Sequence, residues 1–223
     1  MPGRKVILAN NEIYHIFNRG IASMPTFSNH KDYRRAIDAI FYYQNKTVPL
    51  RYAKFLKLPL NERSKLLEEL RVKMNWWVEI ICYCLMPNHF HLLLKQIENN
   101  GISKFVGNFA NSYTRYFNTK QDRKGPIYEG KFKSVRIETE EQLLHVQRYI
   151  HLNPYSGYLI KRPEDLEKFS YSSFPEYVDK DKTGFCSKDL ILSNFKNIGL
   201  FKEFVYNQAD YQKKLVEIKH LLF

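Results

Sequence analysis

YCLMPNHFHLLLK, residues 83–95, places two histidines one residue apart at the head of an apolar run. The β-strand period of two puts His89 and His91 on one face of this run and Phe90 on the other. Two imidazoles side by side on a rigid strand form half of a metal site. A third ligand from elsewhere in the fold would complete it and leave coordination positions open for a substrate.

The neighbouring segments extend the pattern. Residues 76–85 and 88–96 are both apolar and β-prone, with only Met86-Pro87 between them, which predicts an antiparallel pair joined by a tight turn. Further elements are expected as follows: a strand at 13–18 closed by Arg19-Gly20, helices at 31–46 and 102–119, a charged loop at 122–126, a strand at 130–138, and a helix from 139 to Asn153-Pro154 whose Thr139 and Gln142 form a capping box.

This order of elements predicts an α+β fold, a ferredoxin-like sandwich whose antiparallel sheet carries helices on one face, with the last helix as an addition. Residues 1–180 would form the main domain. Residues 47–75 read as an insertion with a helix from Glu62 to about Lys73 capped by Asn61. Residues 181–223 are expected to form a small C-terminal helical segment.

Composition limits the class of protein. The chain has 223 residues, 44% of them hydrophobic, which suits one core of ordinary size. No apolar run reaches the roughly 20 residues of a membrane span, and the N-terminus lacks the apolar stretch of a signal peptide, so a cytoplasmic protein is expected. Three cysteines, two of them in Cys82-x-Cys84, favour buried thiols in a reducing compartment over zinc or redox chemistry.

The net charge of +12 indicates a partner rich in phosphate. Cations crowd the stretch from Arg115 to Arg136, where aromatic side chains are interleaved with them. This mixture is typical of single-stranded nucleic acid binding, in which cations contact phosphates and rings stack on bases. A solvated helix end followed by a half-buried strand is the alternative for any single residue of the stretch.

The stretch RYIHLNP, residues 148–154, supplies the missing chemistry. Tyr149 and Asn153 are four residues apart and share a face of the predicted helix. Tyr149 offers a nucleophile, and the side-chain carbonyl of Asn153 offers a third ligand for a divalent cation held by two imidazoles. His145, one turn before Tyr149, is a candidate supporting partner, whereas His15, His30 and His220 are interpreted as ordinary polar positions.

At these residues the chain resembles the HUH single-tyrosine transposases, most closely the REP-associated tyrosine transposases. The resemblance spans roughly residues 10–178 and rests on four stretches: YHIFNRG at 14–20, CLMPNHFHLLL at 84–94, GKFK at 130–133 and RYIHLNP at 148–154. It implies Tyr149 as the nucleophile and His89, His91 and Asn153 as ligands of Mg or Mn.

The resemblance further implies an enzyme that cleaves and transfers single-stranded DNA near hairpins, through a 5′-phosphotyrosine intermediate and a free 3′ hydroxyl. A homodimer is expected, cytoplasmic and associated with the nucleoid when bound to DNA. The 58 residues between His91 and Tyr149 are compatible with an active site assembled within one chain or between two.

Eight cations are the candidates for DNA contact. They are Arg19, Arg115, Arg123, Lys124, Lys131, Lys133, Arg136 and Arg148. Where relatives commonly have Gln-Gly-Arg before the last core strand, this chain has Glu129-Gly130-Lys131. Replacing Arg by Lys removes a two-pronged phosphate contact, and Glu129 adds a negative charge, so DNA affinity or hairpin preference is expected to differ.

Several functions remain open at this point. The chain could be an active transposase, a host-adopted nuclease acting on repeated hairpins, or a nucleic-acid-binding protein without catalysis. The intact set of His89, His91, Tyr149 and Asn153 argues against the last of these. An RNA-binding module is a further alternative, because ferredoxin-like sheets bearing aromatics also bind RNA, but such a module has no need of metal ligands.

Overall fold

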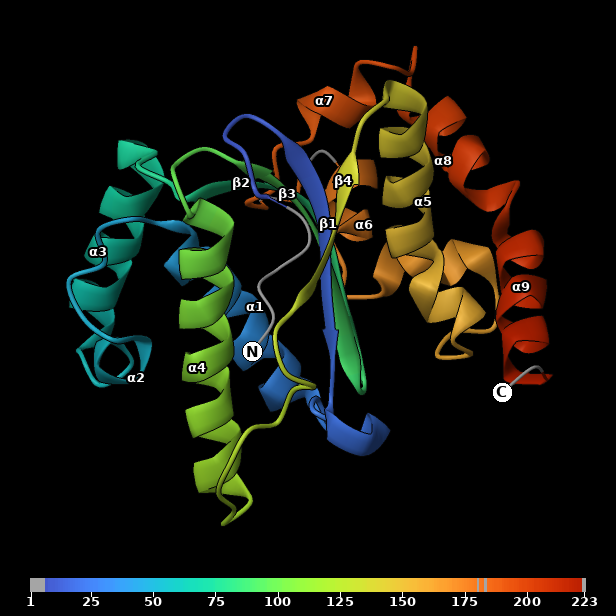
Figure 1. Cartoon of the computed structure of the whole chain (residues 1–223). Helices are drawn as coiled ribbons and strands as arrows, with labels where there is room; N and C mark the ends of the chain where they lie inside the picture. Colours follow the sequence, from blue (N-terminus) through green and yellow to red (C-terminus); the bar gives the residue numbers. More distant parts are fainter. Residues whose placement is uncertain (1–6, 180, 183, 222–223) are drawn as a thin grey trace.

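A four-stranded antiparallel sheet forms the centre of the protein. The computed structural model describes residues 7–179, 181–182 and 184–221. The strands are β1 (Ile13–Arg19), β2 (Val78–Met86), β3 (His89–Gln96) and β4 (Lys133–Ile137), in the spatial order β2-β3-β1-β4. This is the strand order of a ferredoxin-like sandwich, so the predicted fold class is confirmed (Figure 1).

The register of the sheet sets the histidines beside the first strand. The antiparallel pair is confirmed, but the turn is Pro87-Asn88 and not the expected Met86-Pro87, because Met86 still pairs with His89. On the other side of β3, Phe17 lies opposite His91 and Arg19 opposite His89. Because opposed residues point to the same face, β1 contributes its odd-numbered side chains to the face that carries the histidines.

The first face of the sheet is covered by α1 (His30–Gln44) and α4 (Gly101–Lys120), which pack against each other. Tyr14, Ile16 and Phe90 point into this layer and are fully buried there with Phe105 and Phe109. The period-two alternation of the strands explains the burial of even-numbered residues on this side. Both helices agree with the sequence prediction.

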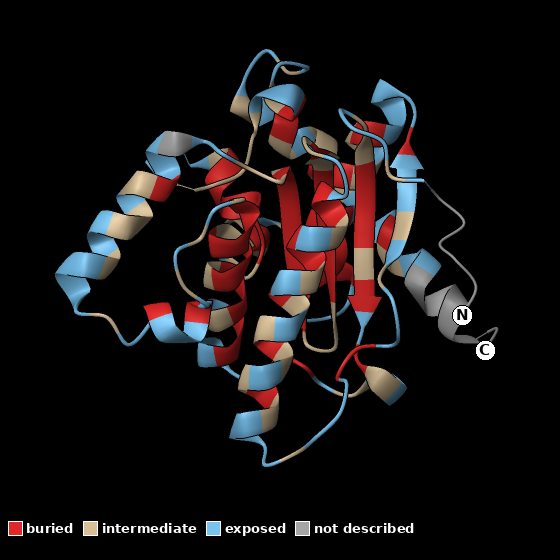
Figure 2. Ribbon diagram, turned by 60° about the vertical axis from the view of Figure 1, so that its left-hand side comes forward, coloured by how far each residue is buried: buried red, intermediate tan, exposed pale blue. Residues whose placement is uncertain are grey.

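The segment 47–75 continues this layer with α2 (Tyr52–Phe55) and α3 (Leu60–Lys73). Figure 2 shows α3 exposed along most of its length. The predicted helix is confirmed, but the predicted cap is wrong. The helix begins at Leu60 after Pro59, and Asn61 lies inside its first turn because proline favours the start of a helix.

The second face is covered by α5 (Glu140–Ser156), which packs mainly on β2 and is seen opposite α4 in Figure 1. The prediction of helices on one face of the sheet therefore describes α1 and α4. It is incomplete, because α5 covers the other face. Cys82 and Cys84 are buried on this side, as predicted for free thiols. Among the odd-numbered residues of β3, which face this side, only Leu93 is apolar. His89 and His91 lie at the edge of this core.

The remaining elements are η1 (Ile21–Ser23), η2 (Pro163–Lys168), α6 (Phe174–Val178), α7 (Asp189–Leu192), α8 (Ile198–Tyr206) and α9 (Ala209–Leu221). Of these, η2, α8 and α9 pack against α5, and α6 packs against η2 and α8. Phe201 and Val205 of α8 are fully buried in the core of the second face. The division of the chain at residue 180 stays a prediction. Within the described ranges, no helix has the length and apolarity needed to cross a membrane.

The helix α5 continues past a proline. Thr139 caps its start by accepting a hydrogen bond from the Gln142 amide at 3.1 Å, as predicted. The expected end at Asn153-Pro154 is wrong, since the helix reaches Ser156. Pro154 cannot donate to the Ile150 carbonyl, and the Asn153 side chain does so instead at 3.4 Å. A side-chain amide thus replaces part of the missing backbone bond.

Candidate active site

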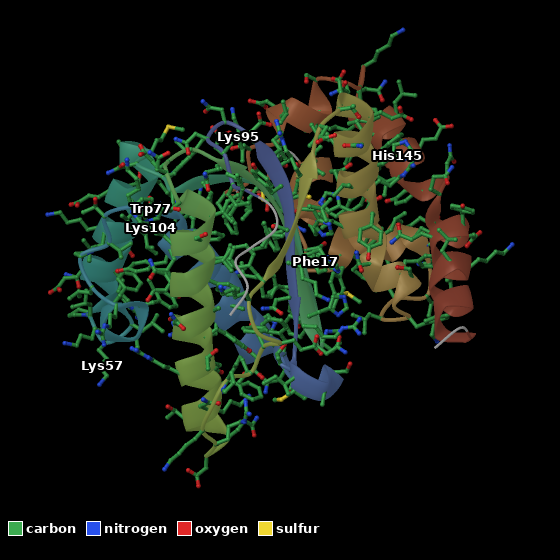
Figure 3. The ribbon with its side chains drawn as sticks, in the orientation of Figure 1. Phe17, Lys57, Trp77, Lys95, Lys104 and His145 are labelled. Carbon is green, nitrogen blue, oxygen red and sulfur yellow. The ribbon has the colours of Figure 1, made fainter. Side chains whose placement is uncertain are left out.

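A pocket of about 280 Å³ lies where the sheet meets α5. Its lining comes from β1, β3, α5 and the end of the loop before β4: Phe17, Asn18, Arg19, His89, His91, Glu129, Lys133 and Tyr149. Figure 3 shows Phe17 between the strands and α5. Tertiary folding therefore brings the two predicted histidines and the predicted tyrosine into one pocket.

Tyr149 stands edge-on to the histidines. Its ring centroid is 5.6 Å from that of His91 and 6.1 Å from that of His15. The side chain is 38% exposed, so the phenol is open to a strand entering the pocket. Within this chain the tyrosine of α5 and the histidines of the sheet thus lie side by side.

The protonation of His89 is set by its neighbour. Its Nδ1 lies 2.6 Å from the side-chain amide oxygen Oδ1 of Asn88, an acceptor, so Nδ1–H donates and the neutral ring keeps a lone pair at Nε2. Burial, and in second place the charge of Arg19, lower the pKa of His89 to about 4. At neutral pH the ring is uncharged and suited to bind a metal ion.

His91 is held from behind by His15. Nδ1 of His91 and Nε2 of His15 are 2.9 Å apart, and the rings stack with centroids 5.1 Å apart. Burial is the main cause that lowers the pKa of both rings, to about 4 for His15. With the shared proton on Nδ1 of His91, its Nε2 is free, which is the usual support that a metal-binding histidine receives.

His15 was missed at the level of sequence, where it was interpreted as an ordinary polar residue. A signal was available. In a ferredoxin-like sheet the first and third strands are neighbours, and His15 alternates with the buried Tyr14 and Ile16. Those two facts place its ring on the face of His91.

Asn153, the predicted third ligand, does not line this pocket, and its role as a ligand stays a prediction. Its side-chain nitrogen donates to the Tyr149 carbonyl at 2.8 Å, which leaves the amide oxygen available. Its side chain also interacts with those of His89 and Tyr149. Two neutral imidazoles and a carbonyl oxygen can coordinate a divalent cation such as Mg or Mn. They would bind it more weakly than typical zinc ligands bind zinc.

The described residues contain no cluster of three or more His, Cys, Asp or Glu side chains arranged for a metal ion. A site here consequently depends on the amide of Asn153 and on oxygen atoms of the substrate or water. Asn88 and His15 each contact an Nδ1 atom, so the Nε2 atoms are the ones that could face such an ion, and that of His89 lies within reach of the Asn153 side chain.

The tyrosine is not activated by its surroundings alone. Burial raises the pKa of Tyr149 above its ordinary value, and the nearby Cys84 adds to this rise. Arg19 and the hydrogen bond with Asn153 act in the opposite direction. The net shift is upward, so deprotonation of the phenol requires further positive charge in the pocket.

The predicted DNA-binding cations fall into separate places. Arg19 and Lys133 line the pocket, and Lys131 lines an adjoining cavity of about 520 Å³. Arg115 lies on the other face of the molecule, beside α1. Lys124 is exposed, and Arg123 donates to the carbonyl of Pro126 at 3.2 Å.

Two more of these cations are engaged with protein groups. Arg136 forms an ion pair with Glu12 at 2.8 Å, and the guanidinium of Arg148 lies 4.3 Å from the ring centre of Phe204 in α8. Nη2 of Arg148 also lies 3.4 Å from Nδ1 of His145, which is seen near the upper end of α5 in Figure 3. A supporting role for His145 at Tyr149 stays a prediction.

Glu129 lines the pocket together with the cations, a placement that the sequence did not reveal. Its backbone N–H donates to the carbonyl of Arg19 at 2.8 Å, and Gly130 follows with a φ of +57°. The left-handed turn at Gly130 returns the chain toward β4 and leaves Glu129 facing the phosphate-binding groups. The departure from the usual Gln-Gly-Arg pattern thus lies in the pocket itself.

The fold and the pocket together define a class: a ferredoxin-like protein with a tyrosine facing a histidine pair. Residues 51–153, a little under half of the chain, match the family model described as Transposase IS200 like. The match includes most of the segment 47–75. It confirms the resemblance to the single-tyrosine transposases that the sequence motifs indicated.

A solved structure has the same fold. "Structure of the REP associates tyrosine transposase bound to a REP hairpin" matches with a TM-score of 0.55, covering 82% of this chain and 92% of that one. At 14% sequence identity the likeness establishes the fold. No curated protein sequence matches this chain.

Proposed function

We propose that this protein is a metal-dependent endonuclease and strand transferase for single-stranded DNA, acting near hairpins through Tyr149 in a transposition reaction. The convergence of Tyr149 with His89 and His91 in one pocket carries the proposal. The hairpin-bound state of the structurally similar transposase supports the choice of substrate. A host-adopted nuclease with the same chemistry is the alternative.

The reaction follows from the pocket. The Tyr149 oxygen attacks the scissile phosphorus, an O–P bond forms, and the bond from phosphorus to the 3′ oxygen breaks. The phenol gives up its proton and the departing 3′ oxygen gains one, so a 5′-phosphotyrosine and a free 3′ hydroxyl result. Attack by a 3′ hydroxyl on this ester reverses the step, and joining therefore needs no energy source.

The neighbouring side chains have defined parts in this scheme. Arg19 and Lys133 offset the charge of the phosphate, and Asn153 fixes the backbone at Tyr149. His89, His91 and Asn153 would hold a divalent ion, Mg or Mn. Such an ion withdraws charge from the scissile phosphate and favours the ionised phenol. The homodimer and the nucleoid location stay predictions.

The test compares the wild-type protein with Tyr149→Phe on labelled single-stranded hairpin DNA with Mn or Mg. A covalent protein–DNA adduct should form with the wild type and not with the variant. Tyr158→Phe is the matched control, because Tyr158 is 57% exposed and does not line the pocket. An adduct that persists in Tyr149→Phe, or none with any hairpin, refutes the mechanism.

The metal requirement has its own measurement. Replacing His89 with Ala should abolish the adduct, while binding of the same DNA stays within about threefold, because phosphate contacts from the cations supply most of the affinity. Adduct formation by the wild type in excess chelator would contradict the proposed metal. If a hairpin RNA binds and the DNA does not, the RNA-binding alternative replaces the proposal.

A further inference from the structure

A cavity of about 900 Å³ lies on the face of the sheet opposite to Tyr149. It is bounded by α1, by α4 and by residues 48–56, the segment around α2. The two helices cover the first face of the sheet, whereas Tyr149 belongs to α5 on the second face. A ligand here does not compete for the catalytic pocket.

The cavity is lined by cations. Arg35, Arg51, Arg115 and Lys120 all contribute, and no Asp or Glu is among the lining residues. Lys120 is neutralised by Asp32, whose carboxylate lies 2.7 Å from its ammonium nitrogen. The other three form no ion pair among the described residues, and the nearby Asp38, which interacts with Arg35, is itself paired with Arg34, so the net charge around the cavity is positive.

Arg35 is the best-placed of these cations. Its guanidinium carbon lies 4.1 Å from the ring centre of Tyr52 and 5.5 Å from that of Tyr116. Its Nη1 is buried and has no hydrogen-bond partner among the described residues. Stacking on rings fixes the plane of the guanidinium but satisfies no N–H donor, so an anion would gain a charged and pre-oriented partner.

The two sides of the cavity differ in chemistry. The helix α4 presents a polar stripe of Asn108, Asn111, Ser112 and Thr119 at helical spacing. The opposite wall is apolar and consists of Val48, Pro49, Leu50, Ala53 and Leu56. A ligand that fits carries a negative group, polar atoms and a flat apolar body, and the volume lies within the range of small-molecule sites.

We propose that this cavity binds a nucleotide unit, with its phosphate at Arg35, Arg51 and Arg115 and its base between the apolar wall and the polar stripe of α4. The unit is either a free nucleotide or part of a nucleic acid strand, since both offer the same group. The proposal does not depend on the chemistry of Tyr149.

The test titrates the full chain by calorimetry with dATP, with inorganic pyrophosphate, and with an oligodeoxynucleotide of about ten thymidines. The wild type should bind dATP or the oligonucleotide, and pyrophosphate more weakly than either. Arg115→Glu and Arg51→Glu should each weaken binding by about tenfold or more, because both exposed side chains lie at the rim.

Lys57→Glu is the matched control. Lys57 is exposed on the same segment, does not line the cavity, and points away from the sheet in Figure 3. It should change the affinity by less than about twofold, and Tyr149→Phe should not change it. Arg35→Lys keeps the charge but loses the planar fork, so it should weaken binding in a chain that melts like the wild type.

The outcomes of these titrations distinguish a free nucleotide from a nucleic acid strand, and both from a failure of the proposal. Binding of dATP identifies a free nucleotide, whereas binding of the oligonucleotide alone identifies a strand. Absence of binding by all probes overturns the proposal, as does equal loss in Arg115→Glu and Lys57→Glu or equal affinity for pyrophosphate and dATP. Adduct formation at Tyr149 reports on the proposed function separately.

Discussion

At the scale of single residues, the histidine pair depends on groups outside the motif. Asn88 and His15 each engage an Nδ1 atom and leave the corresponding Nε2 free. Such partners orient an imidazole and increase its basicity, and their loss commonly costs metal affinity or activity. His15 therefore belongs to the active site although it does not face the substrate.

A prediction follows for His15. His15→Ala should lower adduct formation about 10- to 100-fold at limiting Mn, because His91 loses its acceptor, and excess Mn should restore much of the rate. The measurement is the Mn dependence of adduct formation.

His30→Ala is the control, since His30 is exposed and its ring nitrogen Nδ1 lies 3.2 Å from the Tyr171 hydroxyl, away from the pocket. His15→Gln, which retains a polar group, should keep more activity than His15→Ala. A Mn dependence identical to that of the wild type would show that His15 merely fills the core.

At the scale of elements, α9 holds the helix that carries the nucleophile. The two helices pack along each other. Nε2 of Gln212 donates to the Tyr149 carbonyl at 3.1 Å and to the Ser156 hydroxyl at 3.2 Å. The Tyr155 hydroxyl donates to Asp210 at 2.7 Å. These contacts lie next to Pro154, where the backbone ladder of α5 is interrupted.

Gln212 is thus a positioning residue. Gln212→Ala should lower the rate of adduct formation at saturating DNA about fivefold, the equivalent of one hydrogen bond of about 1 kcal/mol, with DNA affinity unchanged. Single-turnover kinetics and a binding titration measure the two quantities.

Gln208→Ala, one turn earlier, is the matched control because, among the described residues, its side chain forms no hydrogen bond with α5. A loss of DNA affinity in Gln212→Ala with no change in rate would assign the residue to substrate binding instead.

At the scale of the whole molecule, the C-terminal helices complete the core of the second face. Phe201 is fully buried, with ring centroids 5.5 Å from Tyr177 and 6.0 Å from Phe174. The sheet separates this core from the layer of α1 and α4. The catalytic pocket and the larger basic cavity consequently open on opposite faces of one sheet.

Phe201→Ala should lower the free energy of unfolding by about 3–5 kcal/mol, through lost burial and the cavity left behind. One cooperative transition is expected, since the helix shares the core that supports α5. Chemical denaturation followed by circular dichroism measures both.

Leu200→Ala should change stability by less than about 0.5 kcal/mol, because Leu200 is 42% exposed. A separate early transition in Phe201→Ala, with the rest of the chain intact, would instead establish residues 181–223 as an independent unit.

The sequence by itself determined the local features of this protein. The period of two placed His89 and His91 on one face of a strand, and the helical period placed Tyr149 above Asn153. The order of elements implied the strand order of the sheet, because few topologies satisfy short connections and antiparallel pairing.

Only the tertiary structure decided which distant residues meet. It placed His15 behind His91, directed Arg19 and Lys133 into the pocket, and engaged Arg136 with Glu12 and Arg148 with Phe204. The sequence does not show which way a charged side chain points. The second face of the sheet is covered only when segments far apart in the chain pack together. The pocket at Tyr149 and the basic cavity beside α1 are separated for the same reason, because the segments that line them pack on opposite faces of the sheet.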